Sequence, residues 1–181
     1  MLLLPKVRLS LIPSPLIFLV GPIACAPPWH AEAIHILHEL APDVHVACPN
    51  LHPHGIADKV EVVRRGDGPD FESRRAWEWY YLEHAAKHGV IMAWLPTPQK
   101  HDCNIVYGAT TRLELGQWMT RALMDPSINL CVGSDGGFPV ISVIARDLLQ
   151  HLPNSILQPT LRDTCEQAVR MLNMQRFSIG T

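Results

Sequence analysis

The sequence has no surplus of positive charge and no cysteine framework, and both absences narrow its function. Its 181 residues carry a net charge of −2 with a pI near 6.5, which argues against a nucleic-acid-binding surface. The five cysteines form an odd set without a C-x-x-C pair, a pattern more typical of reduced thiols in the cytoplasm than of disulfides. No apolar run is long enough to span a membrane. We therefore expect a cytoplasmic protein that binds neither nucleic acid nor a membrane.

The start of the chain resembles a secretory signal, but the sequence favours a different interpretation. Basic residues, an apolar run at residues 16–20 and a stretch of small residues follow one another, as they do in a signal peptide. Pro13 and Pro15 would break the helix of such a signal, whereas the apolar run has the composition of a buried strand. We expect a single domain over residues 1–181, with residues 1–15 as an N-terminal extension.

Strand-like and helix-like segments alternate along the rest of the chain. We expect strands at residues 16–21, 44–48, 90–95 and 128–133, and helices at residues 28–40, 73–88, 112–124, 139–151 and 160–173, while residues 156–157 are compatible with a further short strand. This alternation predicts an α/β fold, namely a flavodoxin-like or Rossmann-like open parallel sheet of about five strands with helices on both faces. Residues 49–72 are rich in proline, glycine and histidine and are expected to form a long loop.

The stretch at residues 107–118 is the most informative part of the sequence. It follows an apolar run at residues 90–96, and Thr111 to Glu114 matches the S/T-x-x-E pattern of a helix start. A strand, a polar loop and a helix that begins on a carboxylate place Glu114 at the carboxyl edge of a sheet, where ligands bind in open α/β folds. Glu114 is therefore a candidate nucleophile. On these residues alone, a glutamate that only caps the helix is an equal alternative.

Three segments, in order along the chain, carry a resemblance to a known family. They are Ile17-Phe-Leu-Val-Gly-Pro22, Arg75-Ala-Trp-Glu-Trp79 leading into Gly89-Val-Ile-Met-Ala-Trp-Leu-Pro96, and Thr111-Arg-Leu-Glu-Leu-Gly116. Together they resemble the nucleoside 2-deoxyribosyltransferase superfamily, specifically its 2-deoxyribosyltransferase-like branch, from about residue 16 to the last helix. The resemblance implies a homo-oligomeric enzyme without a metal or other cofactor. Its substrate would be a small molecule, a (deoxy)nucleoside or nucleotide whose N-glycosidic bond is cleaved or transferred.

The resemblance also assigns roles to two carboxylates. Glu114 would attack the anomeric carbon as the nucleobase leaves, and an acceptor base or water would then resolve the intermediate. Glu78 would bind the sugar or handle the proton of the base. Burial beside Trp77 or Trp79 would raise the pKa of Glu78 and suit it to acid assistance, whereas an i,i+4 pair with Arg74 would make it an ordinary surface residue.

The chain departs from the family's pattern at positions that bind substrate. Well-characterised members carry an aspartate about six residues before the nucleophile, where this chain has Gly108, and a tyrosine on the first strand, where it has Phe18 and Leu19. Substrate contacts must then come from the turn after the first strand and from polar residues around the glutamate. The candidates are Gly21, Pro22, Asn104, Tyr107, Thr110 and Arg112.

Histidines invite a metal-site interpretation that the spacing does not favour. His45, Cys48, His52 and His54 lie within ten residues, and zinc accepts such ligands. The C-x-x-x-H-x-H spacing matches no standard structural zinc site, so we expect no metal here.

Two alternatives to a transferase remain open. One is an N-glycoside hydrolase of nucleoside monophosphates, in which water replaces the acceptor base. The other is a nucleotide-binding or sensor protein that has kept the fold and lost turnover, because fold alone does not fix function.

Overall fold

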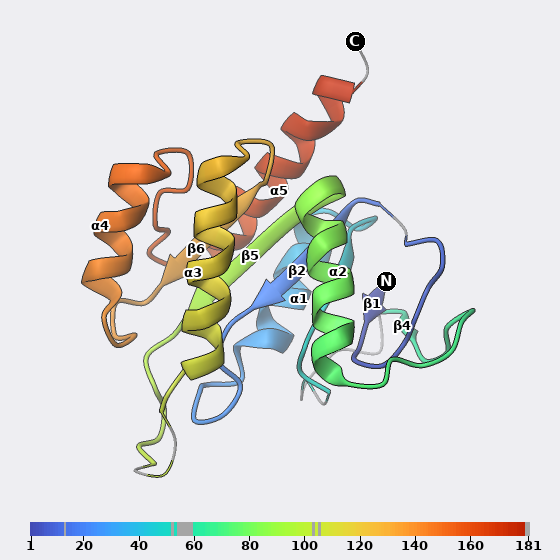
Figure 1. Ribbon diagram of the computed structural model, residues 1–181, viewed down its shortest axis with the longest axis horizontal. Coiled ribbons are helices and arrows are strands. Elements are labelled where there is room, and N and C mark those ends of the chain that lie inside the picture. The colour runs from blue at the N-terminus through green and yellow to red at the C-terminus, as the bar shows by residue number, and fades with distance from the viewer. Residues whose placement is uncertain (13, 52, 54–59, 103, 105, 180–181) are drawn as a thin grey trace.

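Six parallel strands form one open sheet with helices on both faces, which confirms the predicted α/β fold, with one strand more than expected (Figure 1). The computed structural model describes residues 1–12, 14–51, 53, 60–102, 104 and 106–179. The strands are β1 (Leu2–Leu3), β2 (Leu16–Val20), β3 (His45–Ala47), β4 (Val62–Val63), β5 (Gly89–Leu95) and β6 (Leu130–Ser134). The helices are α1 (Trp29–Leu40), α2 (Arg74–His88), α3 (Ala109–Met124), α4 (Ile141–His151) and α5 (Leu161–Ile179).

The strand order is β4-β1-β3-β2-β5-β6, so β2 and β5 are neighbours at the centre of the sheet. Every residue of β2 and β5 is buried, as expected for parallel strands covered on both faces. Alternate residues face opposite layers. Ile17 and Leu19 pack with α1 and α5 in one core cluster, whereas Phe18 and Val20 pack with α2, α3 and α4 in the other.

The helices divide between the two faces of the sheet according to these clusters. Figure 1 shows α2 and α3 running side by side in front of the sheet, with α1 behind it. α3 turns one apolar stripe inward through Thr111, Leu115, Trp118 and Ala122, the spacing that keeps residues on one side of a helix. Within the described part of the chain, no helix has both the length and the apolarity needed to cross a membrane.

The chain changes direction across the sheet between β2 and β5. α1, which follows β2, covers one face, whereas α3, which follows β5, covers the other. The carboxyl ends of these two strands therefore form a topological switch point, the usual place for a ligand-binding crevice in an open α/β sheet.

The first residues of the chain belong to the sheet, which the sequence analysis did not predict. β1 pairs in parallel with β3 and with β4, so part of the expected N-terminal extension is a strand with neighbours on both sides. Leu2 and Leu3 are completely buried. Two-residue strands are too short to show an alternating pattern, and for this reason both β1 and β4 were missed.

α3 begins earlier than the capping-box pattern predicted, and that prediction was wrong. The helix starts at Ala109 after Gly108, which has left-handed backbone angles (φ 63°, ψ 27°), and the N–H of Arg112 already donates to the carbonyl of Gly108 at 2.9 Å. Thr111 is buried and lies inside the first turn. Glu114 is the sixth residue of the helix, so the partial positive charge of the helix N-terminus, which fades within the first turn, does little to ionise it.

Candidate active site at the carboxyl end of the sheet

A cavity of about 420 Å³ lies beyond the carboxyl end of β2, where the first turns of α2 and α3 meet. It contains both predicted carboxylates, Glu114 and Glu78, and two of the predicted substrate-binding residues, Gly21 and Thr110. Among the described residues, the lining consists of Phe18, Gly21, Ile23, Ala24, Pro49, Arg74, Arg75, Glu78, Thr110, Leu113 and Glu114. The cavity thus lies at the carboxyl edge of the sheet, where the strand–loop–helix pattern around Glu114 predicted a ligand site.

Arg75 joins the two carboxylates. Its Nη1 donates to Oε2 of Glu78 at 3.2 Å and also to Oε1 of Glu114. The Glu78 and Glu114 side chains are only 16% and 13% exposed, whereas that of Arg75 is 40% exposed. The Arg74–Glu78 surface pair considered above is therefore replaced by an Arg75–Glu78 pair at i,i+3 inside the cavity. Two acids and one base give the cluster a net negative charge when all three are ionised.

Burial and like charge act on Glu114 in the same direction. Desolvation is the main effect that raises the pKa of Glu114 above its ordinary value, and the neighbouring Glu78 adds to the rise, while Arg75 opposes both. Glu78 is bound to the same guanidinium through Oε2, and the proton-donating role expected for it from the sequence stays a prediction. The charge of Glu114 therefore depends on both its burial and its two charged neighbours.

Gly21 allows the strand ends to approach each other at the rim of the cavity. A Cβ atom at this position would lie 2.4 Å from the carbonyl oxygen of Trp94 and 2.5 Å from the Trp29 ring, so no larger residue fits. Pro22 is buried beside it, and its carbonyl accepts a hydrogen bond from Nε1 of Trp29 at 3.0 Å. Gly21 lines the cavity and Pro22 supports the turn behind it, without lining the cavity.

Two more of the predicted substrate-binding residues do not line this cavity. The hydroxyl of Tyr107 donates to the carbonyl of Pro96 at 2.9 Å, and its ring packs against Phe138. This contact ties the loop after β5 to the turn after β6. Asn104 is exposed, and its backbone N–H donates to Asp102. Sequence proximity to Glu114 was the only ground for choosing these residues.

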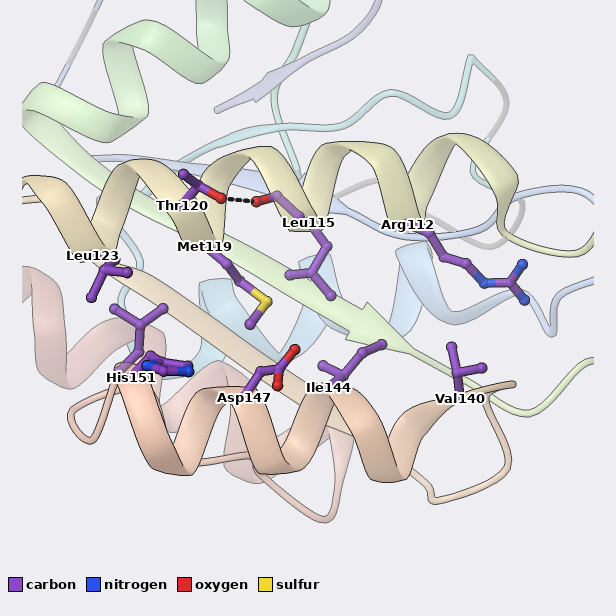
Figure 2. Close-up of a pocket in the computed structure, with 11 residues that line it drawn as sticks. Arg112, Leu115, Met119, Thr120, Leu123, Val140, Ile144, Asp147 and His151 are labelled. Atoms are coloured by element: carbon purple, nitrogen blue, oxygen red, sulfur yellow. Dashed lines mark hydrogen bonds between the residues drawn. The ribbon is translucent and has the colours of Figure 1, made fainter.

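Arg112 also lies away from Glu114, in a second cavity of about 400 Å³ between α3 and α4. Figure 2 shows Arg112 at one end of this groove, near Val140, with Leu123 and His151 at the other end. The guanidinium of Arg112 lies 5.4 Å from the centre of the Phe138 ring, and its Nε is buried without a hydrogen-bond partner among the described residues. Arg112 therefore does not share a cavity with Glu114, and its predicted contact with the substrate stays a prediction. Residues two apart on a helix point to nearly opposite sides.

Gly108, at the position where the resembled family carries an aspartate, has no room for a larger side chain. Gly108 adopts a left-handed conformation that strains residues with a Cβ atom. A Cβ atom there would lie 2.8 Å from two carbons of the buried Phe138 ring. The departure at Gly108 is thus part of how α3 begins, and an aspartate cannot be introduced without moving Phe138.

The described residues contain no group of three or more histidine, cysteine or acidic side chains placed to hold a metal ion. Of the histidine–cysteine cluster noted in the sequence, Cys48 is fully buried, and burial raises the pKa of its thiol to about 12. His45 belongs to β3, and burial lowers its pKa. His52 and His54 lie outside the described residues.

Comparison with known proteins finds no relative of this chain. No protein-family model matches the chain, and no curated protein or solved structure is similar enough to count as a match. Function must therefore be argued from the site itself.

The sequence analysis gave no role to Arg75, the residue at the centre of the site. Its i,i+3 spacing to Glu78 was a usable signal, because such residues are neighbours on a helix. Its contact with Glu114 could not be predicted from the sequence, because the two residues lie on different helices and are 39 positions apart. Arg74 was considered only as a surface partner for Glu78, yet it also lines the cavity.

Proposed function

We propose that this protein cleaves or transfers the N-glycosidic bond of a (deoxy)nucleoside or nucleotide, with Glu114 as the nucleophile. The observation that supports this proposal most is the shared cavity of Glu114 and Glu78 at the switch point of the sheet. Both carboxylates bind the same nitrogen of Arg75. Their bonded oxygens therefore lie close together within one cavity.

In the proposed first step, a carboxylate oxygen of Glu114 forms a bond to the anomeric carbon. The bond from that carbon to the base nitrogen breaks, its electron pair stays on the base, and the base takes up a proton from solvent. In the second step, a nitrogen of an acceptor base or a water oxygen attacks the anomeric carbon and loses a proton. The ester bond to Glu114 breaks, and the free carboxylate is regenerated. The carboxyl oxygens of Glu78, in the same cavity, are placed to accept hydrogen bonds from sugar hydroxyls.

The size and lining of the cavity suit a ligand of this class. A volume of about 420 Å³ falls within the range of small-molecule sites. Phe18, Leu113 and Pro49 supply apolar surface for a base or sugar face. The polar groups come from the first turns of α2 and α3, so they converge on the ligand from two helices.

The test is base release from a panel of nucleosides and their 5′-monophosphates, with and without an added free base. Glu114→Gln keeps the shape and removes the nucleophile, and we expect it to lower the rate by about 10³-fold or more. Glu83→Gln is the matched control, because Glu83 also joins α2 to α3 through an arginine, Arg121, and does not line the cavity. Equal rates of base release by wild type and Glu114→Gln would refute the assignment of Glu114 as the nucleophile.

A non-catalytic nucleotide-binding protein is the second candidate, and one contact favours it. Arg75 occupies Oε1 of Glu114, so an anionic ligand could bind to the arginine without any reaction at the carboxylate. Under this candidate, a nucleotide binds wild type and Glu114→Ala with equal affinity, and neither protein releases base from any member of the panel.

A further inference from the structure

Arg75 makes more contacts at the site than an interhelical salt bridge needs. Its Nη1 binds both Glu78 and Glu114, and its guanidinium carbon lies 5.5 Å from the centre of the Trp79 ring. The aromatic face holds the cation in place from one side. The arginine is thus fixed by three neighbours, two of which are the carboxylates that line the cavity.

A second arginine on the same pair of helices provides an internal comparison. Arg121 of α3 reaches back to Glu83 of α2 and lies 4.2 Å from the centre of the Trp118 ring. The Trp79 and Trp118 rings are themselves in contact, with 6.5 Å between their centres. Arg121 therefore links α2 and α3 with one carboxylate. Arg75 also links the two helices through a carboxylate and lies over a tryptophan ring, but it binds a second carboxylate as well. The link between the helices therefore does not explain its contact with Glu78.

We propose that Arg75 is the positioning residue of this site, which holds Glu114 beside Glu78 with Oε1 bound, so that Oε2 is the oxygen available for attack. Among the described residues, no hydrogen bond to Oε2 of Glu114 is present. Two neighbouring carboxylates repel each other when both are ionised, and one of them otherwise keeps its proton. The guanidinium between them offsets that repulsion. This inference rests on the proposed function for its catalytic meaning.

Among the residues that the structure describes, the charged groups that face Glu114 across the cavity come from α2. They are Arg74, Arg75 and Glu78, while β2 and the segments after β2 and β3 contribute Phe18, Gly21, Ile23, Ala24 and Pro49, which carry no charge. A change in the ionisation of Glu114 after mutation of Arg75 can therefore be separated from a general loss of positive charge by mutating Arg74. It can be separated from loosened helix packing by mutating Arg121.

The experiment measures the ionisation of Glu114 directly, by carbon NMR of its carboxyl group across pH, with the signal assigned by its loss in Glu114→Gln. We expect Arg75→Gln to move the titration of Glu114 upward by about one pH unit or more. Arg75→Lys, which keeps the charge, should restore most of the wild-type value and guards against a misfolded Arg75→Gln. Arg74→Gln should cause a clearly smaller shift, and Arg121→Gln none. An unchanged titration in both Arg75 variants, or an equal shift in Arg121→Gln, would overturn the proposal.

Base release gives a second readout and separates the two proposals. If the protein is active, the acidic limb of its pH–rate profile should move upward in Arg75→Gln together with the NMR titration. If wild type releases no base from any substrate while the titration shifts as expected, the positioning role stands and the proposed function fails. If Glu114→Gln is inactive but the profile of Arg75→Gln matches wild type, the proposed function stands and the positioning role fails.

Discussion

Arg75 in the first turn of α2 binds the carboxylate of Glu114 in the second turn of α3. This contact crosses between the two helices that cover one face of the sheet, and it lies at the carboxyl end of β2. Glu114 is buried except for 13% of its side chain, so the arginine decides how much of its negative charge is compensated. The contact links the packing of α2 against α3 to the chemistry of the cavity.

The stability of the protein should depend on pH through Glu114 in a direction opposite to that of a glutamate whose pKa is lowered by an ion pair. Its pKa is raised in the folded state, mainly by burial, so the folded protein holds this proton more tightly than the unfolded chain. The contribution of Glu114 to stability is therefore fully present below its unfolded pKa and is lost as pH rises through the folded pKa. Relative to wild type, Glu114→Gln should gain stability as pH increases from about 4 to 7.

Glu83→Gln provides the control with the opposite sign. The hydrogen bond from Arg121 is the main cause that lowers the pKa of Glu83, so ionised Glu83 stabilises the fold above its unfolded pKa. Relative to wild type, this variant should lose stability as pH rises from about 3 to 5, and the difference should stay constant above that range. Urea unfolding at a series of pH values measures both differences, and parallel curves for the two variants would contradict the account.

Replacing Gly108 should destabilise the protein by a mechanism that a glycine elsewhere on α3 does not share. Gly108→Ala places a Cβ atom in a left-handed conformation and against the Phe138 ring, with an expected cost of about 1–3 kcal/mol in the free energy of unfolding. Gly116→Ala is the comparison, because a Cβ atom there meets nothing within 4 Å and should stabilise α3 by about 0.5–1 kcal/mol. Denaturant unfolding of both variants tests the prediction, and equal effects would refute it.

The helices and the central strands could be predicted from the sequence because each has a hydrophobic pattern within its own segment. The apolar stripe of α3 and the continuous apolar runs of β2 and β5 are visible in the sequence, and the structure has all three elements within a few residues of the expected bounds. The start of α3 was misjudged because Thr111 has the identity of a capping residue but is buried in the first turn. A left-handed Gly108 has no sequence signature beyond being glycine.

The site was predictable only in part, for a geometric reason. Thr110 and Glu114 are four residues apart on α3 and line the same cavity, whereas Arg112 lies between them in sequence and on another side of the helix. Because the sequence did not reveal where α3 begins, it could not show which of these three residues face the same cavity. Glu78 was predicted as a site residue only because of the resemblance to a known family. The link that joins Glu78 to Glu114 depends on how two helices pack, which no single segment of sequence encodes.

The most direct test of the central claim is to look for the sugar on Glu114. The protein is mixed with a nucleoside or nucleotide from which it releases base, quenched with acid during turnover and examined by intact-mass and peptide mass spectrometry. We predict a mass increase equal to the sugar or sugar phosphate, confined to the peptide that contains Glu114 and absent from Glu114→Gln. A sugar attached to a different residue, or base release that continues at the wild-type rate in Glu114→Gln, would contradict it.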